Sequence, residues 1–87
     1  MPEAAMHVIS SAVVSVMPGR REAVVEALAG MSGAEVRAAA GSKIVVILEG
    51  ADRGEVGGRL LRIADLDGVV SANMVFEHVE TDTEVPT

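Results

Sequence analysis

A six-residue pattern of apolar residues and a turn that ends in glycine occurs twice in this sequence, 35 residues apart. Its two copies are Leu28-Ala29-Gly30-Met31-Ser32-Gly33 and Ile63-Ala64-Asp65-Leu66-Asp67-Gly68. Each copy closes a stretch with apolar residues at helical spacing, and a segment expected to be a strand lies on either side of that stretch. Each half therefore predicts a strand, a helix and a second strand, so the whole chain reads β-α-β-β-α-β.

Segments rich in valine, isoleucine and small residues predict strands over residues 7–16, 43–49 and 69–78, and the turn at Gly30 and Gly33 predicts a further short strand over residues 34–38. Apolar residues at i, i+4 and i+7 predict two helices, from about residue 19 to residue 29 and from about residue 52 to residue 64. Pro18 suits the start of the first helix because its missing N–H would be unpaired there. Asp52 and Glu55 have the spacing of a capping box and predict the start of the second.

This element order predicts an α+β fold of the ferredoxin-like split βαβ type, a four-stranded antiparallel sheet with both helices on one face. We expect the first and third strands at the centre of the sheet, parallel to each other, with the fourth strand opposed to them. A chain of 87 residues can bury one core. We expect one domain over residues 7–78, an N-terminal extension over residues 1–6, and an acidic, disordered tail over residues 79–87.

Strand alternation divides the sheet residues between the two faces. Those expected to meet the helices are Val8, Ala12, Val14, Val16, Ile44, Val46, Leu48, Val70, Ala72, Met74 and Phe76. Those expected on the other face are Ile9, Ser11, Val13, Ser15, Val45, Ile47, Ser71, Asn73 and Val75. Such a surface of small and β-branched side chains, covered by no helix, suggests a partner, either a peptide or a second copy of the chain.

Charge and composition exclude several partners. The net charge of −6 argues against a nucleic acid, and a single aromatic residue, Phe76, cannot supply the stacking platforms of an RNA-binding sheet. A basic peptide is the more natural partner. No apolar run approaches the roughly 18 residues of a membrane span, so membrane insertion is not expected. Because Glu3 stands where a signal peptide carries positive charge, residues 6–17 are interpreted as a strand of a protein that remains where it is made.

No catalytic motif is present, so neither an enzyme nor a cofactor is expected. The absence of cysteine removes thiolate chemistry and zinc fingers. His7, His78 and Glu80 could meet at one end of the sheet as a metal site. Two isolated histidines at strand ends are more often bystanders, so no metal is expected. The dipeptide Arg20-Arg21 follows an apolar strand rather than leading an apolar segment and is interpreted as helix surface.

Two carboxylates, Glu35 and Glu49, belong to one hairpin that turns near Gly41, and we expect them roughly opposite each other on the uncovered face. They could receive cationic groups of a partner. Alternatively, Arg37 and Lys43 on the same hairpin could neutralise them as cross-strand pairs. The residues alone leave both interpretations open.

Several segments, in order, resemble the NapD family. They are Ile9-Ser10-Ser11-Ala12-Val13-Val14, Pro18 with Arg20, Gly33-Ala34-Glu35-Val36, residues 41–49, Gly68-Val69-Val70-Ser71-Ala72 and Val75-Phe76. The resemblance spans about residues 7–78. It departs from the family at Phe76, where tyrosine is common, and at Glu77, where histidine is common.

The resemblance implies a cytoplasmic chaperone that binds the twin-arginine signal peptide of the periplasmic nitrate reductase catalytic subunit (NapA) and delays its export until its molybdenum cofactor is installed. The peptide-binding residues would then be Ile9, Ser11, Val13, Glu35, Val45, Ile47, Glu49, Ser71, Asn73, Val75 and Glu77. Two alternatives remain. One is an ACT-like regulatory module that binds a small molecule near residues 17–19, and the other is a homodimer formed weakly through the uncovered face.

Overall fold

The computed structural model describes residues 6–81 of the chain. The elements follow the predicted order: β1 (Met6–Val16), α1 (Arg21–Ala29), β2 (Ala34–Ala40), β3 (Lys43–Gly50), α2 (Arg53–Ala64) and β4 (Val69–Thr81). Met6 and residues 79–81 belong to β1 and β4. The rest of the expected N-terminal extension and acidic tail lies outside the described residues.

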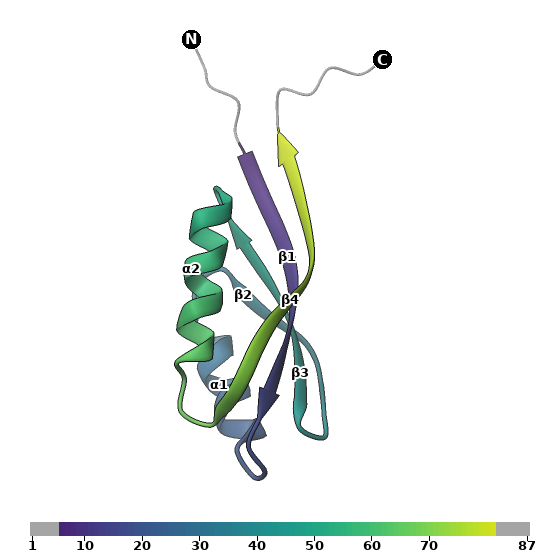
Figure 1. Cartoon of the computed structure of the whole chain (residues 1–87), viewed down its shortest axis with the longest axis vertical. Coiled ribbons are helices and arrows are strands. Elements are labelled where there is room, and N and C mark those ends of the chain that lie inside the picture. The colour runs from purple at the N-terminus through teal and green to yellow at the C-terminus, as the bar shows by residue number, and fades with distance from the viewer. Residues whose placement is uncertain (1–5, 82–87) are drawn as a thin grey trace.

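The strands form one antiparallel sheet in the order β2-β3-β1-β4, and both helices lie on the same side of it (Figure 1). The ferredoxin-like split βαβ fold is therefore confirmed. The expectation that β1 and β3 run parallel was wrong. Each helix is a crossover that returns the chain in its starting direction, so α1 makes β1 parallel to β2. The hairpin then reverses β3, which must oppose β1.

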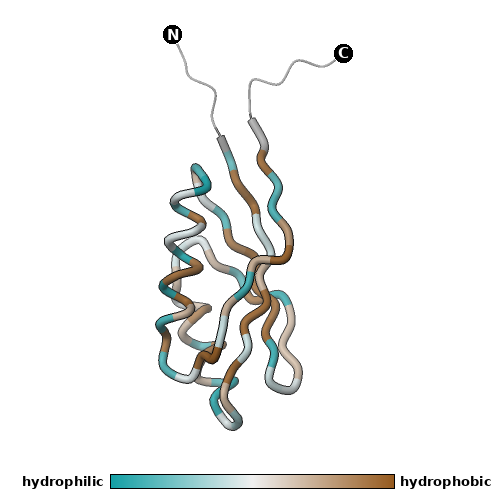
Figure 2. The backbone as a smooth tube through the Cα atoms, in the orientation of Figure 1, coloured by the Kyte–Doolittle hydropathy of each residue, from teal (hydrophilic) through white to brown (hydrophobic). Residues whose placement is uncertain are grey.

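The core lies between the helices and the central strands. Its fully or nearly fully buried apolar residues are Val8, Ala12, Val14, Val16, Val24, Leu28, Ile44, Val46, Leu48, Val56 and Ile63. The predicted inward residues of β1 and β3 are all among them, and Figure 2 shows that hydrophobic positions are concentrated in the strands of the sheet. Each of the valine, leucine and isoleucine side chains among them stabilises the fold by about 1.5 to 3 kcal/mol relative to exposure.

The helix starts follow local chemistry. The side chain of Asp52 accepts a hydrogen bond from the backbone N–H of Glu55 at 2.8 Å, as the capping box predicted. The carboxylate of Glu55 in turn accepts the N–H of Ala51 at 2.6 Å. α1 begins two residues later than expected, at Arg21, because Gly19 has a φ of +81°, which no right-handed helix contains.

Two irregularities in β4 change which of its residues face the helices. Val16 pairs with Val69 but Ser15 pairs with Ser71, so Val70 is an extra residue in the strand. In the same way Val75 is extra, because Ala12 pairs with Met74 and Ser11 with Phe76. Each bulge shifts the alternation by one residue.

The predicted orientation of part of β4 was therefore wrong. Val70 is 63% exposed and Phe76 59% exposed, so neither belongs to the core. Val69, Ala72, Met74 and Val79 pack against the core instead. Past the second bulge, Phe76 lies opposite Ser11 on the uncovered face of the sheet, while Glu77 lies opposite the buried Ser10 on the helix side.

Candidate functional site

The face of the sheet opposite the helices is formed by side chains that pair across the strands and alternate with the buried ones. We call this surface the open face. Its residues are His7, Ile9, Ser11, Val13 and Ser15 of β1, Lys43, Val45, Ile47 and Glu49 of β3, Glu35, Ala38 and Ala40 of β2, and Ser71, Asn73, Phe76 and His78 of β4.

An apolar strip runs along the middle of the open face and consists of Ile9, Val13, Val45, Ile47 and Phe76. Val13 lies directly opposite Val45, and Ser11 lies between Ile47 and Phe76. The four aliphatic residues are half-buried by their neighbours in the sheet, whereas Phe76 remains 59% exposed. A partner that covered this strip would remove a contiguous apolar surface from water.

Two polar residues of β4, Ser71 and Asn73, were predicted to lie beside this strip. Ser71 lies opposite Ser15, and Asn73 lies opposite Val13, so both are on the open face as expected. Val75 is the extra residue of a bulge and is 62% exposed. Phe76 was expected to face the helices, because neither bulge contains a glycine or proline that would mark an irregular strand.

Both predicted carboxylates of the hairpin lie at one end of the open face. Glu35 pairs with Ile47, and Glu49 pairs with Ile9, so the two glutamates are diagonal neighbours rather than directly opposite. They line a shallow hollow of about 220 Å³ together with Gly33, Ala34 and Ile47. The sequence-based placement of these two side chains is thus close to the observed one.

The structure does not contain the alternative contacts in which Arg37 and Lys43 neutralise Glu35 and Glu49, within the described residues. Lys43 Nζ donates a hydrogen bond to Ser15 Oγ at 3.0 Å. Glu49 instead approaches His7, with 3.4 Å between Glu49 Oε1 and His7 Nε2. Within residues 6–81 no ion pair joins Arg37 or Lys43 to either glutamate. The His7 contact is half exposed, so it contributes little to stability and can be exchanged.

Glu77 lies on the other side of the sheet. Its carboxylate accepts a hydrogen bond from Arg53 Nε at the start of α2, at 3.0 Å. The predicted position of Glu77 beside the uncovered face was wrong because the bulge at Val75 reverses the alternation before it. Glu77 and Glu49 are thus at the same end of the sheet but on opposite faces.

Histidines also gather at the acidic end of the open face. His78 lies opposite Ile9 on one side, as Glu49 does on the other, and His7 precedes Ile9 by two residues on the same face. Among residues 6–81, no three His, Cys, Asp or Glu side chains are grouped as metal ligands.

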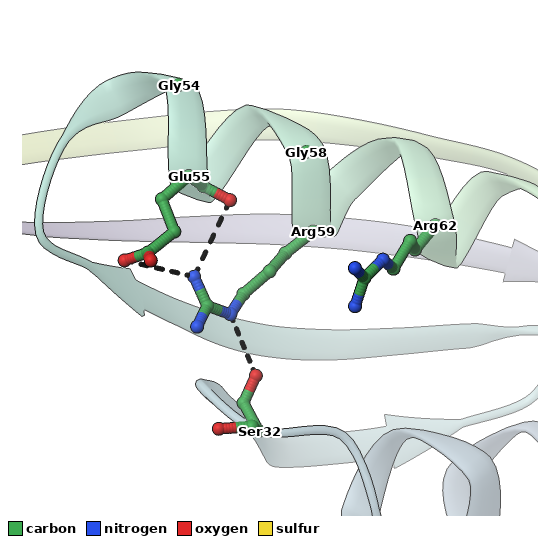
Figure 3. A pocket seen from close by; sticks show the side chains of 6 residues that line it. All are labelled: Ser32, Gly54, Glu55, Gly58, Arg59 and Arg62. Atoms are coloured by element: carbon green, nitrogen blue, oxygen red, sulfur yellow. Dashed lines mark hydrogen bonds and ion pairs between the residues drawn. The ribbon is translucent and has the colours of Figure 1, made fainter.

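A second hollow, of about 300 Å³, lies on the outer side of α2 beside the turn before β2 (Figure 3). Arg59 Nε donates to the backbone oxygen of Ser32 at 2.7 Å, and Arg59 Nη1 is 3.4 Å from Glu55 Oε1. A side chain at Gly33, which has a φ of +78°, would overlap the Arg59 guanidinium. These contacts give Arg59 a structural role, since they tie α2 to the turn between α1 and β2.

An antiparallel sheet of four strands, two helices on one face and an uncovered opposite face define a ferredoxin-like split βαβ domain. No helix within residues 6–81 has both the length and the apolar character needed to cross a membrane.

The family model described as NapD protein matches residues 6–81. A curated protein named Chaperone NapD, from Paracoccus pantotrophus, is 44% identical over 71 residues, which are 82% of this chain. The chain belongs to the NapD family, as the resemblance predicted. The matched region spans 63% of the length of that relative.

The solution structure of the E. coli Tat proofreading chaperone protein NapD has the same fold, with a TM-score of 0.76 over 93% of this chain and 86% of that one. The two sequences are 19% identical, so this comparison concerns the fold alone.

Proposed function

We propose that this protein is a cytoplasmic chaperone that binds the twin-arginine signal peptide of the periplasmic nitrate reductase catalytic subunit, NapA. Binding would delay export of that subunit until its molybdenum cofactor is installed. Membership of the NapD family supports this proposal, as does the relative named Chaperone NapD. The protein itself would need no cofactor and catalyse no reaction, because sequestering the peptide is sufficient.

The observation that carries the proposal is the composition of the open face. A twin-arginine signal peptide is basic near its start and apolar after it. The open face has Glu35 and Glu49 at one end, and the apolar strip continues from there along the sheet. A peptide that docks as an amphipathic helix can place its arginines at the glutamates and its apolar side on the strip.

Arginine is favoured over lysine at these carboxylates by geometry. A guanidinium can donate two parallel N–H bonds to one carboxylate, whereas an ammonium group is a point charge without that planar match. Glu49 is able to accept such a group by exchanging its contact with His7, which is 44% exposed. Each charge-assisted bond is worth about 1.5 to 3 kcal/mol where water is partly excluded, and less at an exposed rim.

Isothermal titration with a synthetic signal peptide of the reductase tests the proposal. The Arg-Arg peptide should bind, a Lys-Lys version should bind more weakly, and added salt should weaken the Arg-Arg peptide. Glu49→Gln should reduce the affinity for the Arg-Arg peptide more than for the Lys-Lys peptide. Glu77→Gln is the matched control, because it removes the same charge on the helix side and should leave both affinities nearly unchanged.

Equal losses for both peptides, or a loss for Glu77→Gln as large as for Glu49→Gln, would remove the glutamates from the site. Failure of the Arg-Arg peptide to bind would refute the function. A homodimer through the open face would appear in sedimentation as concentration-dependent association that the peptide dissociates. An amino acid that raises the melting temperature when the peptide does not would favour the ACT-like module instead.

A further inference from the structure

We propose that the signal peptide lies on the open face in one direction only, with its arginines at Glu35 and Glu49 and the C-terminal end of its helix over Lys43 and Ser15. This inference rests on the proposed function and extends it, since binding to the open face does not by itself specify a direction.

The open face is electrically polar along its strands. At one end the row across the sheet contains Glu49 beside Ile9, and Glu35 lies in the next row. At the other end Lys43 pairs with Ser15, and Lys43 Nζ donates a hydrogen bond to Ser15 Oγ at 3.0 Å. The paired positions around Lys43 on the open face carry no carboxylate within the described residues. Arg37 stands at the bulge of β2, outside these paired rows.

A bound helix has a matching polarity. Its last carbonyl groups have no partner within the helix and give the C-terminus a partial negative charge. Lys43 offers an ammonium group at the place where those carbonyls would lie. In the reversed direction the arginines of the peptide would approach Lys43, and the carbonyls would approach Glu49. Both contacts would then be repulsive. The electrostatic interaction at each end of the open face is therefore attractive in one direction of the peptide and repulsive in the other.

The length of the open face sets the length of the docked helix. From Glu49 to Lys43 is six residues along β3, and from Ile9 to Ser15 is six residues along β1. At about 3.3 Å per residue this distance is roughly 20 Å. A helix rises about 1.5 Å per residue, so roughly 13 residues after the arginines reach Lys43. A peptide truncated well before that point would keep its arginine contacts and lose the contact with Lys43.

The direction can be measured with a nitroxide spin label placed at either terminus of the Arg-Arg peptide and nitrogen-15-labelled protein. A label at the N-terminus should broaden the amide signals near Ile9 and Glu49, and a label at the C-terminus should broaden those near Ser15 and Lys43. The reversed pattern, or equal broadening of both ends by both labels, would overturn the proposed direction. Absence of any spectral change with unlabelled peptide would overturn the proposed function and the direction with it.

A charge reversal provides the second measurement. Lys43→Glu makes an acidic protein more acidic, so a simple net-charge effect would tighten binding of a basic peptide. The proposed direction requires the opposite, a loss of about two- to fivefold in affinity from the unfavourable helix end. Arg62→Glu is the matched control, since it makes the same charge change on the exposed outer side of α2. Tightening by Lys43→Glu equal to that by Arg62→Glu, with the protein folded, would refute a role for Lys43.

Discussion

Val13 and Val14 are neighbours in β1 that point to opposite faces of the sheet. Substituting each in turn with aspartate therefore tests the open face and the core separately. Val14 is fully buried beneath the helices, whereas Val13 is half-buried beside Val45 on the open face. Val14→Asp forfeits about 1.5 to 3 kcal/mol of apolar burial. It also leaves a carboxyl group without a partner in the core, at about 1 to 3 kcal/mol or more.

Together these losses reach the lower end of the stability of a small domain, which is about 5 to 15 kcal/mol. Val14→Asp should therefore be largely unfolded, or melt at least about 10 °C lower, since 1 kcal/mol shifts the melting temperature of so small a domain by about 4 to 8 °C. At Val13 the loss of strand propensity is at most about 1 kcal/mol, so Val13→Asp should remain folded. It should nevertheless bind the signal peptide at least about tenfold more weakly, because a carboxylate would be desolvated against the apolar side of the peptide.

Circular dichroism on heating measures the first effect, and isothermal titration measures the second. A folded Val14→Asp together with an unfolded Val13→Asp would show that the faces are assigned the wrong way round. A folded Val13→Asp variant with unchanged affinity would refute the open face as the binding site while leaving the fold intact.

Five further substitutions test the packing and the site. Leu28→Ala should lower the free energy of unfolding by about 2 to 5 kcal/mol in a denaturant titration, whereas Leu61→Ala, at a 72% exposed position of α2, should change it by less than about 0.5 kcal/mol. Phe76→Ala should weaken the peptide in isothermal titration with little change in stability, because its ring is 59% exposed on the open face, and a large loss of stability would contradict that placement. Gly57→Ala should raise stability by about 0.5 to 1 kcal/mol, since nothing lies within 4 Å of the added methyl group, but Gly33→Ala should lower it because the methyl group would meet the Arg59 guanidinium at a positive φ.

The element order and the core of the central strands follow from the sequence. The β-branched runs of residues 7–16 and 43–49 contain no breaker, so the inward apolar residues of β1 and β3 could be assigned from the strand period, although the buried Ser10 was not among them. The capping pair of Asp52 and Glu55 is also a local signal, because both side chains act within one turn of their own helix. Such features depend only on residues that are close together in the sequence, so the sequence is sufficient to predict them.

The direction of β1 relative to β3 also follows from the chain, since two crossover helices and one hairpin leave no other arrangement. The expectation that β1 and β3 run parallel was therefore inconsistent with the predicted element order itself. The positions of Glu35 and Glu49 could also be predicted closely from the sequence, which placed them roughly opposite each other where the structure makes them diagonal neighbours. Both residues belong to one hairpin, and a short turn restricts the register of its strands.

The second half of β4 required the tertiary structure. No glycine or proline among residues 69–78 marks the bulges at Val70 and Val75, and the consecutive apolar residues at those two places do not by themselves show which residue is extra. A bulge arises from how β4 pairs with β1 beneath α2, far away in the sequence, and one extra residue exchanges the faces of everything that follows. That pairing moves Phe76 onto the open face and turns Glu77 toward Arg53, because cross-strand register is a property of two segments and is written in neither alone.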